Sequence, residues 1–145
     1  MADLSTYIEL HNNTPYTLKF ASETEVHGDW NVRPPATIAS LKSASFSMKD
    51  PSWIIPAGSE GTVTYQVAVP DTNEESNKPP INVTFIVRFC DSYSADNNYC
   101  IFITSHPELF AIYFEAKTGN DDWHKNHCPQ SGHPVYLRLF IKATS

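Results

Sequence analysis

Histidines and a cysteine near the end of the chain are the side chains best suited to acid–base or metal chemistry. His124, His127, Cys128 and His133 form a His-x-x-His-Cys-x4-His segment, and His106 lies upstream. Zinc takes three or four such nitrogen and sulfur ligands, but prolines interrupt this segment and it has no Cys-x-x-Cys knuckle. We therefore expect no metal. The segment is either an ordinary polar loop or a pH switch, because histidine changes charge near about pH 6.5.

The chain has three cysteines, which is too few for a disulfide scaffold. Cys90 and Cys100 bracket a short polar loop. If two neighbouring strands end and begin there, these two can form a disulfide; otherwise all three thiols stay reduced. The sequence has neither a Gly-x-Ser-x-Gly elbow nor an isolated pair of carboxylates. We therefore expect a protein that is not an enzyme and needs no cofactor.

Three tryptophans offer a different chemistry, which is contact with a membrane interface. Trp30 and Trp53 fall in predicted loops, and Trp123 follows two aspartates in a polar segment. An indole at a loop tip can place its ring among lipid headgroups while its N–H stays hydrated. The alternative is that each ring folds back over one end of the core. We expect at least one of Trp30 and Trp53 to be exposed.

Two segments are predicted to position these groups. Ser22–Ile38 is interpreted as a long ordered connection, because Pro34 and Pro35 stop regular structure, and it carries Trp30 near the surface. Gly58–Gly61 is interpreted as a turn before a strand, since it has no following lysine and no helix to make a phosphate loop. Glu60 in this turn either contacts a lipid headgroup or is simply solvated.

Alternating apolar and polar residues run through most of the chain and predict short strands. Thr6–His11 and Tyr16–Phe20 are predicted to form a hairpin around Asn12–Pro15. Leu109–Lys117 suits a strand, although its first residues also suit a short helix. The other predicted strands are Ser43–Lys49, Thr62–Val69, Ile81–Cys90, Tyr99–Thr104 and Val135–Ala143. We predict an all-β fold, an antiparallel β-sandwich of about eight or more strands, as a single domain over residues 1–145.

The charge of the chain excludes some partners. Its net charge is −6, with 16 acidic and 10 basic residues, and the basic residues form no cluster. We therefore expect no nucleic-acid binding, which depends on neutralising phosphates. Met1–Ser5 lacks the basic and apolar regions of a signal peptide. We expect a protein made without an evident leader, cytoplasmic or released.

An ordered set of residues carries a family resemblance. It begins with Ile8-x-Leu10-x-Asn12-x-Thr14-x-x-x-Leu18 and Gly28-x-Trp30. It continues with Pro34-Pro35, Ile38, Phe46, Gly58-Ser59-Glu60-Gly61-Thr62-Val63-x-Tyr65 and a strand end at Phe89–Asp91. This set resembles the aegerolysin family, and most of all the small component of two-component insecticidal toxins of bacteria. The resemblance covers Thr6 to about Asn98 and is weaker beyond.

The resemblance implies a β-sandwich that recognises membrane lipid, often a sphingolipid or a lipid in a sterol-rich bilayer. It also implies pore formation, including hemolysis, with a larger partner of the membrane-attack-complex/perforin type at the target-cell membrane. Trp30 matches the tryptophan of the family's Gly-x-Trp stretch. Tyr93 lies where fungal members carry aromatic residues after an acidic one, although this chain has no tryptophan there.

Two other functions stay open. In a lectin, exposed Trp and Tyr rings would stack on sugars, with Asp91, Asp96 and Asn97 bonding hydroxyls. A zinc hydrolase on the histidine-rich segment would require bound metal. Assembly into a homo-oligomer is a further open alternative. We favour membrane binding through Trp30, Trp53, Tyr93, Trp123 and Glu60.

Overall fold

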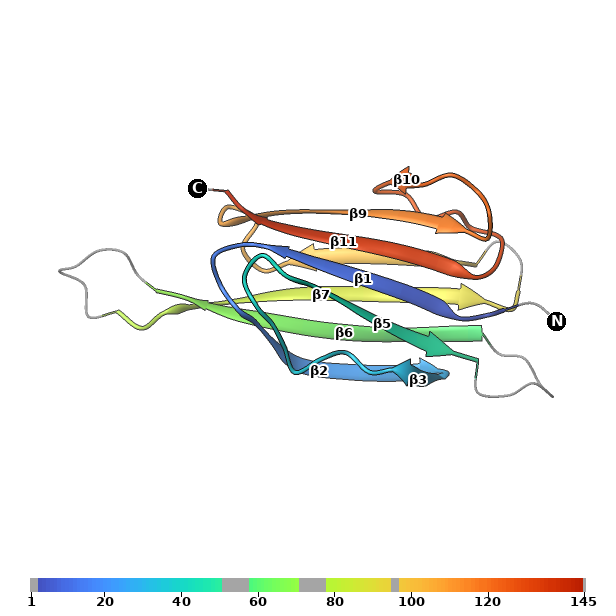
Figure 1. Ribbon diagram of the computed structural model, residues 1–145, viewed down its shortest axis with the longest axis horizontal. Coiled ribbons are helices and arrows are strands. Elements are labelled where there is room, and N and C mark those ends of the chain that lie inside the picture. The colour runs from blue at the N-terminus through green and yellow to red at the C-terminus, as the bar shows by residue number, and fades with distance from the viewer. Residues whose placement is uncertain (1–2, 51–57, 71–77, 95–96, 145) are drawn as a thin grey trace.

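Two β-sheets packed face to face make up the fold. The computed structural model describes residues 3–50, 58–70, 78–94 and 97–144, and its two layers are seen in Figure 1. The sheets have strand orders β10-β9-β11-β1-β5-β3 and β4-β2-β6-β7-β8. The strands of the described residues are β1 (Thr6–Asn13), β2 (Leu18–His27), β3 (Asp29–Val32), β4 (Thr37–Ile38), β5 (Ser43–Lys49), β6 (Gly58–Val69), β7 (Ile81–Ser92), β8 (Tyr99–Thr104), β9 (Phe110–Thr118), β10 (His124–Lys125) and β11 (Val135–Ala143). The predicted β-sandwich is confirmed. The described part of the chain contains no helix that is long and apolar enough to cross a bilayer.

Alternating side chains from both sheets fill the space between the layers. Val83, Phe85 and Val87 in β7 are buried, whereas Arg88 next to them is exposed. In β11 the buried set is Val135, Leu137, Leu139 and Ile141. Each such side chain contributes roughly 1.5–3 kcal/mol when it leaves water. The period-2 pattern therefore decides which face of each strand is inside.

One strand pair departs from the antiparallel arrangement. β1 and β11 run parallel, in register from Thr6 opposite Val135 to Asn13 opposite Lys142. The other paired strands of both sheets are antiparallel. The terminal strands thus lie side by side in the middle of the six-stranded sheet.

The predicted hairpin of the first two segments is wrong. β1 belongs to the six-stranded sheet and β2 to the five-stranded sheet, so Asn12–Pro15 crosses between layers instead of turning within one. The buried side chain of Asn12 makes this crossing possible. Its Nδ2 donates to the carbonyl oxygens of Tyr16 at 2.7 Å and Ile38 at 3.0 Å. Alternation identified both strands, but it does not say which sheet a strand joins.

The predicted connection over Ser22–Ile38 is also wrong, because most of it is strand. β2 continues to His27, and Gly28, with φ of 107°, turns the chain into β3. β3 is the edge strand of its sheet and ends before Pro34 and Pro35. That placement fits proline, which has no N–H for a neighbouring strand.

The predicted turn at Gly58–Gly61 is the first part of β6. Gly61 pairs with Phe89, and a Cβ on Gly61 would lie 2.8 Å from the carbonyl oxygen of Thr24. Glycine is therefore needed here for close approach of strands and not for a turn. As a result, Glu60 projects from a rigid strand rather than from a flexible loop.

Candidate functional site

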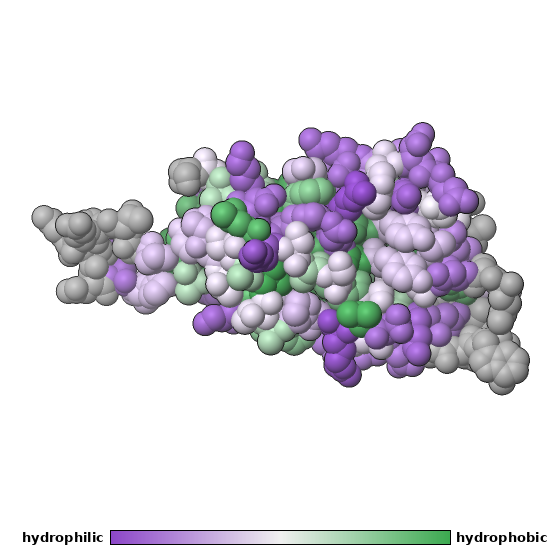
Figure 2. All heavy atoms as spheres, in the orientation of Figure 1, coloured by the Kyte–Doolittle hydropathy of each residue, from purple (hydrophilic) through white to green (hydrophobic). Residues whose placement is uncertain are grey.

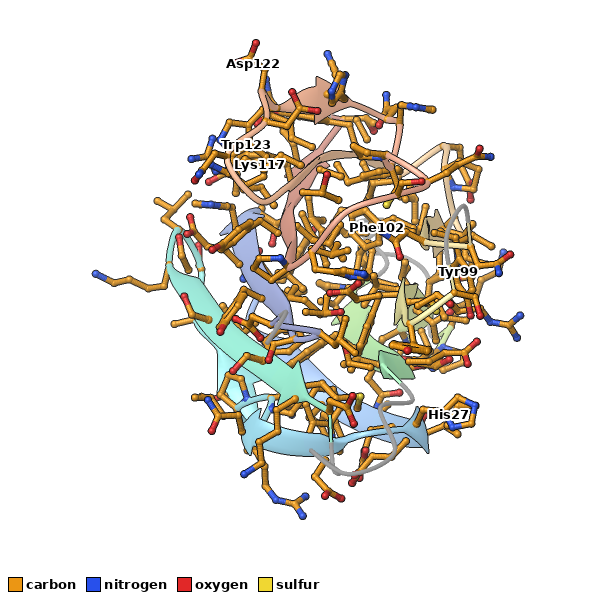
Figure 3. All side chains as sticks on the ribbon, turned by 90° about the vertical axis from the view of Figure 1, so that its right-hand side faces the viewer. His27, Tyr99, Phe102, Lys117, Asp122 and Trp123 are labelled. Carbon is orange, nitrogen blue, oxygen red and sulfur yellow. The ribbon has the colours of Figure 1, made fainter. Side chains whose placement is uncertain are left out.

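Glu60 lies at one end of the sandwich, in a row of side chains across the five-stranded sheet. The register places His27, Glu60, Cys90 and Tyr99 opposite one another on β2, β6, β7 and β8. The hydroxyl of Tyr99 donates to Glu60 Oε1 at 2.8 Å, and His27 Nε2 lies 3.9 Å from Glu60 Oε2. We call His27, Glu60 and Tyr99 the Glu60 cluster. Figure 3 views the molecule from this end, with His27 and Tyr99 on the five-stranded side.

The Tyr99–Glu60 hydrogen bond bridges across β7. Cys90 lies between the two residues in the row, which explains why a thiol on the outer face is almost fully buried. Burial, followed by the hydrogen bond to Glu60, raises the pKa of Tyr99 well above its ordinary value. The phenol is therefore a stable donor that fixes the Glu60 carboxylate in place.

Trp30 is half-buried, with its ring turned inward. The ring centroid lies 6.1 Å from the rings of both Phe46 and Phe89, which belong to the core. Its Nε1 donates to Glu23 Oε2 at 2.6 Å, and the guanidinium of Arg33 lies 4.0 Å from the other Glu23 oxygen. Of the two alternatives for Trp30, a membrane contact or a ring folded back over the core, these contacts favour the ring that covers one end of the core. Trp53 lies outside the described residues.

Two exposed side chains with apolar surface lie at the same end of the sandwich as the Glu60 cluster. Tyr93 follows the end of β7 and is 61% exposed, and Val26 near the end of β2 is 51% exposed. These strand ends flank the start of β6, so both side chains lie at the same end of the sandwich. We call this region, consisting of the Glu60 cluster with Val26 and Tyr93, the Glu60 end. It combines a fixed carboxylate with apolar groups that water surrounds.

A buried carboxylate lies behind this end, between the sheets. Asp91 in β7 is fully buried, and its Oδ1 is bonded to His133 Nδ1. Its Oδ2 has no hydrogen-bond partner among the residues that the structure describes. Burial raises the pKa of Asp91 to about 6, against the opposing effect of His133. Asp91 was weighed as a sugar ligand, but its inward position keeps it from any surface ligand.

The histidine-rich segment is dispersed over separate contacts. His133 is held by Asp91, whereas His124 lies 3.7 Å from Asp121 and its ring is 5.9 Å from that of His127. Cys128 is buried in the core cluster. Among the described residues, no group of three or more His, Cys, Asp or Glu side chains is placed to hold a metal ion.

A disulfide between Cys90 and Cys100 is not formed, and all three cysteines are free. Cys100 pairs with Phe89, whose side chain is in the core, so Cys100 also points inward. Cys90 pairs with Tyr99 and points outward. The two sulfurs therefore lie on opposite faces of the sheet. The sequence showed that the two cysteines flank a loop. It did not show that each pairs with the residue next to the other cysteine, which places the two side chains on opposite faces.

A second candidate site lies on the outer face of the six-stranded sheet. It is a groove of about 420 Å³ that crosses β11, β1 and β5. We call it the Trp123 groove, and the residues that matter below are Trp123, Tyr136, Arg138, Tyr7, Ser45 and Asn31. Trp123 lines one side and β3 the other. Figure 3 shows Trp123 and Lys117 on the six-stranded side, apart from His27 and Tyr99.

Stacked rings and cations build the Trp123 side of this groove. The guanidinium of Arg138 lies 3.8 Å from the centre of the Trp123 ring. The ammonium of Lys117 lies 5.2 Å from Trp123 and 5.3 Å from Tyr136, and Tyr136 is stacked on Tyr7 at 5.3 Å. Such cation–ring contacts are worth about 0.5–1 kcal/mol at exposed sites. The loop that carries Trp123 is therefore held against the sheet.

Sequence reasoning singled out Trp123 but missed its neighbours. Tyr7 in β1 and Tyr136 and Arg138 in β11 occupy the outward positions of well-patterned strands. Aromatic residues on the face that alternation assigns to water were the available signal. The pairing of β1 with β11, which brings Tyr7 to Tyr136, could not be seen from the pattern.

The fold is similar to that of a solved lipid-binding protein. No family model matches the chain, and no curated protein matches it in sequence. Among solved structures, it is similar to the lipid-binding protein Nakanori, with a TM-score of 0.54 and 11% sequence identity. The match covers 95% of this chain and 70% of that chain. At this identity the likeness shows the shared β-sandwich fold.

Proposed function

We propose that the protein binds a membrane lipid through the Glu60 end and acts as the small component of a two-component pore-forming toxin. The observation that carries the lipid-binding part is the likeness to a lipid-binding protein over 95% of this chain. The Glu60 end supports it, because an exposed aromatic ring beside fixed polar groups suits the boundary between water and acyl chains.

The chemistry of the Glu60 end suits a zwitterionic headgroup. The carboxylate of Glu60 is fixed by Tyr99 and has His27 on its other side. It attracts the cationic group of a sphingolipid-like headgroup, while Tyr93 and Val26 enter the interface. Trp30 supports this end from within by covering the core below it.

The larger partner is inferred from the aegerolysin resemblance of Thr6 to about Asn98. In this proposal the chain marks the target-cell membrane, and a partner of the membrane-attack-complex/perforin type forms the pore. An insecticidal role follows from the resemblance to the bacterial small components.

Vesicle flotation tests the lipid-binding part. We expect the protein to float with phosphatidylcholine–cholesterol vesicles that contain sphingomyelin or ceramide phosphoethanolamine. The double variant Val26→Ser/Tyr93→Ser should lower binding by about tenfold, since it removes the apolar contacts. Leu41→Ser is the matched control, because Leu41 is 74% exposed near the opposite end of the sandwich. Wild-type protein that floats with none of these vesicles would refute the proposal.

Dye release tests the partner. Vesicles that bind the protein should retain a trapped dye with this chain alone and release it when a larger perforin-like partner is added. Strong release by this chain alone would contradict the recruiting role, and binding without release under any condition would leave only lipid recognition.

A further inference from the structure

We propose that the Trp123 groove is a second ligand site that binds a saccharide carrying a carboxylate, such as a sialic or uronic acid residue. This inference does not depend on lipid binding at the Glu60 end. It rests on the shape of the groove, on its mixture of rings and polar groups, and on the two cations that lie at Trp123.

The groove has the size and lining of a site for a sugar ring. Its volume of about 420 Å³ falls within the range of small-molecule sites, roughly 300–1,000 Å³. Trp123 and Tyr136 contribute aromatic rings to the lining, and the exposed residues Asn31 and Ser45 contribute an amide and a hydroxyl group. A pyranose needs this combination, because its C–H face packs on an aromatic ring while its hydroxyls form hydrogen bonds.

The lining of the groove combines mostly apolar surface with a few polar groups. Figure 2 shows the outer face of the six-stranded sheet, whose coloured residues are mostly white to purple with small separate green spots. Large apolar ligands and partners bind contiguous apolar patches. The polar lining residues Asn31, Ser45 and Arg138 supply amide, hydroxyl and guanidinium groups that can bond the hydroxyls of a saccharide.

The charges at Trp123 select an acidic ligand. Arg138 and Lys117 both contact the Trp123 ring, and neither belongs to the ion pairs found among the described residues. The carboxylate of Glu9, which also lines the groove, is turned to His11. A guanidinium has donors left for a ligand carboxylate even while its face rests on a ring. A quaternary ammonium, by contrast, would meet two cations at this ring.

The register of the paired strands places the groups of the groove without a bound ligand. Tyr7, Tyr136 and Lys117 stand opposite one another on β1, β11 and β9. Glu9, Arg138 and Glu115 form the next row on the same face. These positions are set by backbone pairing in the middle of the sheet, and the cations of Arg138 and Lys117 hold the loop residue Trp123 against them, so these groups are already in place for a ligand.

Titration with soluble sugars tests the proposal. The probes are 3′-sialyllactose and lactose, followed by isothermal calorimetry and by quenching of tryptophan fluorescence. We expect sialyllactose to bind at least about tenfold more tightly than lactose. Trp123→Ala should weaken this binding by at least about tenfold, because it removes a central aromatic anchor. Arg138→Gln combined with Lys117→Gln should remove the preference for the acidic sugar.

Matched controls separate a binding defect from a folding defect. Tyr113→Ala removes an exposed ring on the same face that does not line the groove, and it should leave sugar binding unchanged. Unfolding curves of each variant show whether it is folded at the temperature of the titration. If Trp123→Ala is unfolded, Asn31→Ala and Ser45→Ala test the other side of the groove, each with an expected loss of several-fold.

The source of the sugar is decided by two further arms. In the first, the Val26→Ser/Tyr93→Ser variant is mixed with vesicles that contain a sialylated glycolipid, so that binding occurs through the groove alone. In the second, soluble sialyllactose is added and should compete with the vesicles for the groove. Binding of the free sugar without binding of the vesicles would assign the groove to soluble glycans. Three results would each overturn the proposal. They are no binding of sialyllactose at millimolar concentration, equally tight binding of lactose, and sialyllactose binding that Trp123→Ala leaves unaffected.

Discussion

The Glu60 end and the Trp123 groove use similar side chains in opposite electrostatic settings. At the Glu60 end, a phenol donates to a carboxylate, and exposed apolar groups stand beside it. In the groove, two cations rest on an indole, and polar groups face it across the sheet. An aromatic residue therefore does not define a ligand by itself. The charge held next to the ring decides whether a cationic or an anionic group is attracted.

Trp30 and Trp123 also differ between these two regions. Trp30 is turned into the core and bonded to Glu23, whereas Trp123 lies on the outside of a finished sheet. The first ring stabilises the fold near one site, and the second ring is part of the other site. Replacing each ring should therefore have a different main effect.

The largest effect is expected for Trp30→Ala. The change should lower the free energy of unfolding by about 2–4 kcal/mol, because it leaves a cavity against Phe46 and Phe89 and leaves the Glu23 carboxylate without its indole partner. Trp123→Ala should cost less than about 1 kcal/mol. Urea unfolding curves measure both. Equal losses for the two variants would erase the distinction between a core lid and a surface ring.

A pH effect on stability is expected beneath the Glu60 end. The pKa of Asp91 is raised from 3.8 to about 6 by burial, so its ionisation costs folding free energy as pH rises through about 6. Below about pH 4 that cost is absent. Between pH 4 and 7, wild type should lose about 2 kcal/mol of stability relative to Asp91→Asn. Unfolding curves across this range measure the difference, and a constant difference would contradict the raised pKa.

A smaller effect is expected for Tyr99→Phe. The variant removes the hydrogen bond to Glu60 and should lower stability by about 0.5–1.5 kcal/mol. It should also expose Cys90, because the bond lies above the thiol. Burial raises the pKa of Cys90 to about 12, so faster alkylation by iodoacetamide would report the opening. Sugar binding in the groove should not change, and a change there would show that the two regions are coupled.

The smallest effect is expected for reduction. With the sulfurs of Cys90 and Cys100 on opposite faces of the sheet, dithiothreitol should move the melting temperature by less than about 1 °C. Neither vesicle binding nor sugar binding should respond. A clear fall of the melting temperature on reduction would mean that a disulfide forms after all.

Strand positions were the part of the fold most open to prediction. The predicted bounds of Ser43–Lys49, Tyr99–Thr104 and Val135–Ala143 are those of β5, β8 and β11. These segments combine a clean period-2 pattern with turn residues on both sides, and buried faces enforce that pattern physically. The segment from Leu109, which also suited a helix, forms strand β9 because its neighbours β11 and β10 pair with it.

The pairing of the strands and the burial of individual side chains could not be predicted in the same way. The sequence left Trp30 open between a membrane contact and a ring over the core, and only the pairing of β3 with β5 shows that the ring turns inward. Glu60 was singled out from the sequence, but its partners Tyr99 and His27 come from strands that the sequence could not align. The groove combines side chains from β1, β3, β5, β11 and a loop, and alternation gives only the face of each residue.

The parallel pairing of β1 with β11 has a mechanical consequence. The first strand enters at the Glu60 end and the last strand leaves at the other, as the positions of N and C in Figure 1 show. A force that draws the two chain ends apart therefore slides the strands along each other. The register of eight residue pairs from Thr6 to Asn13 is loaded together under that force, instead of opening pair by pair. The sandwich should resist stretching along its length far better than peeling at its edge strand β3.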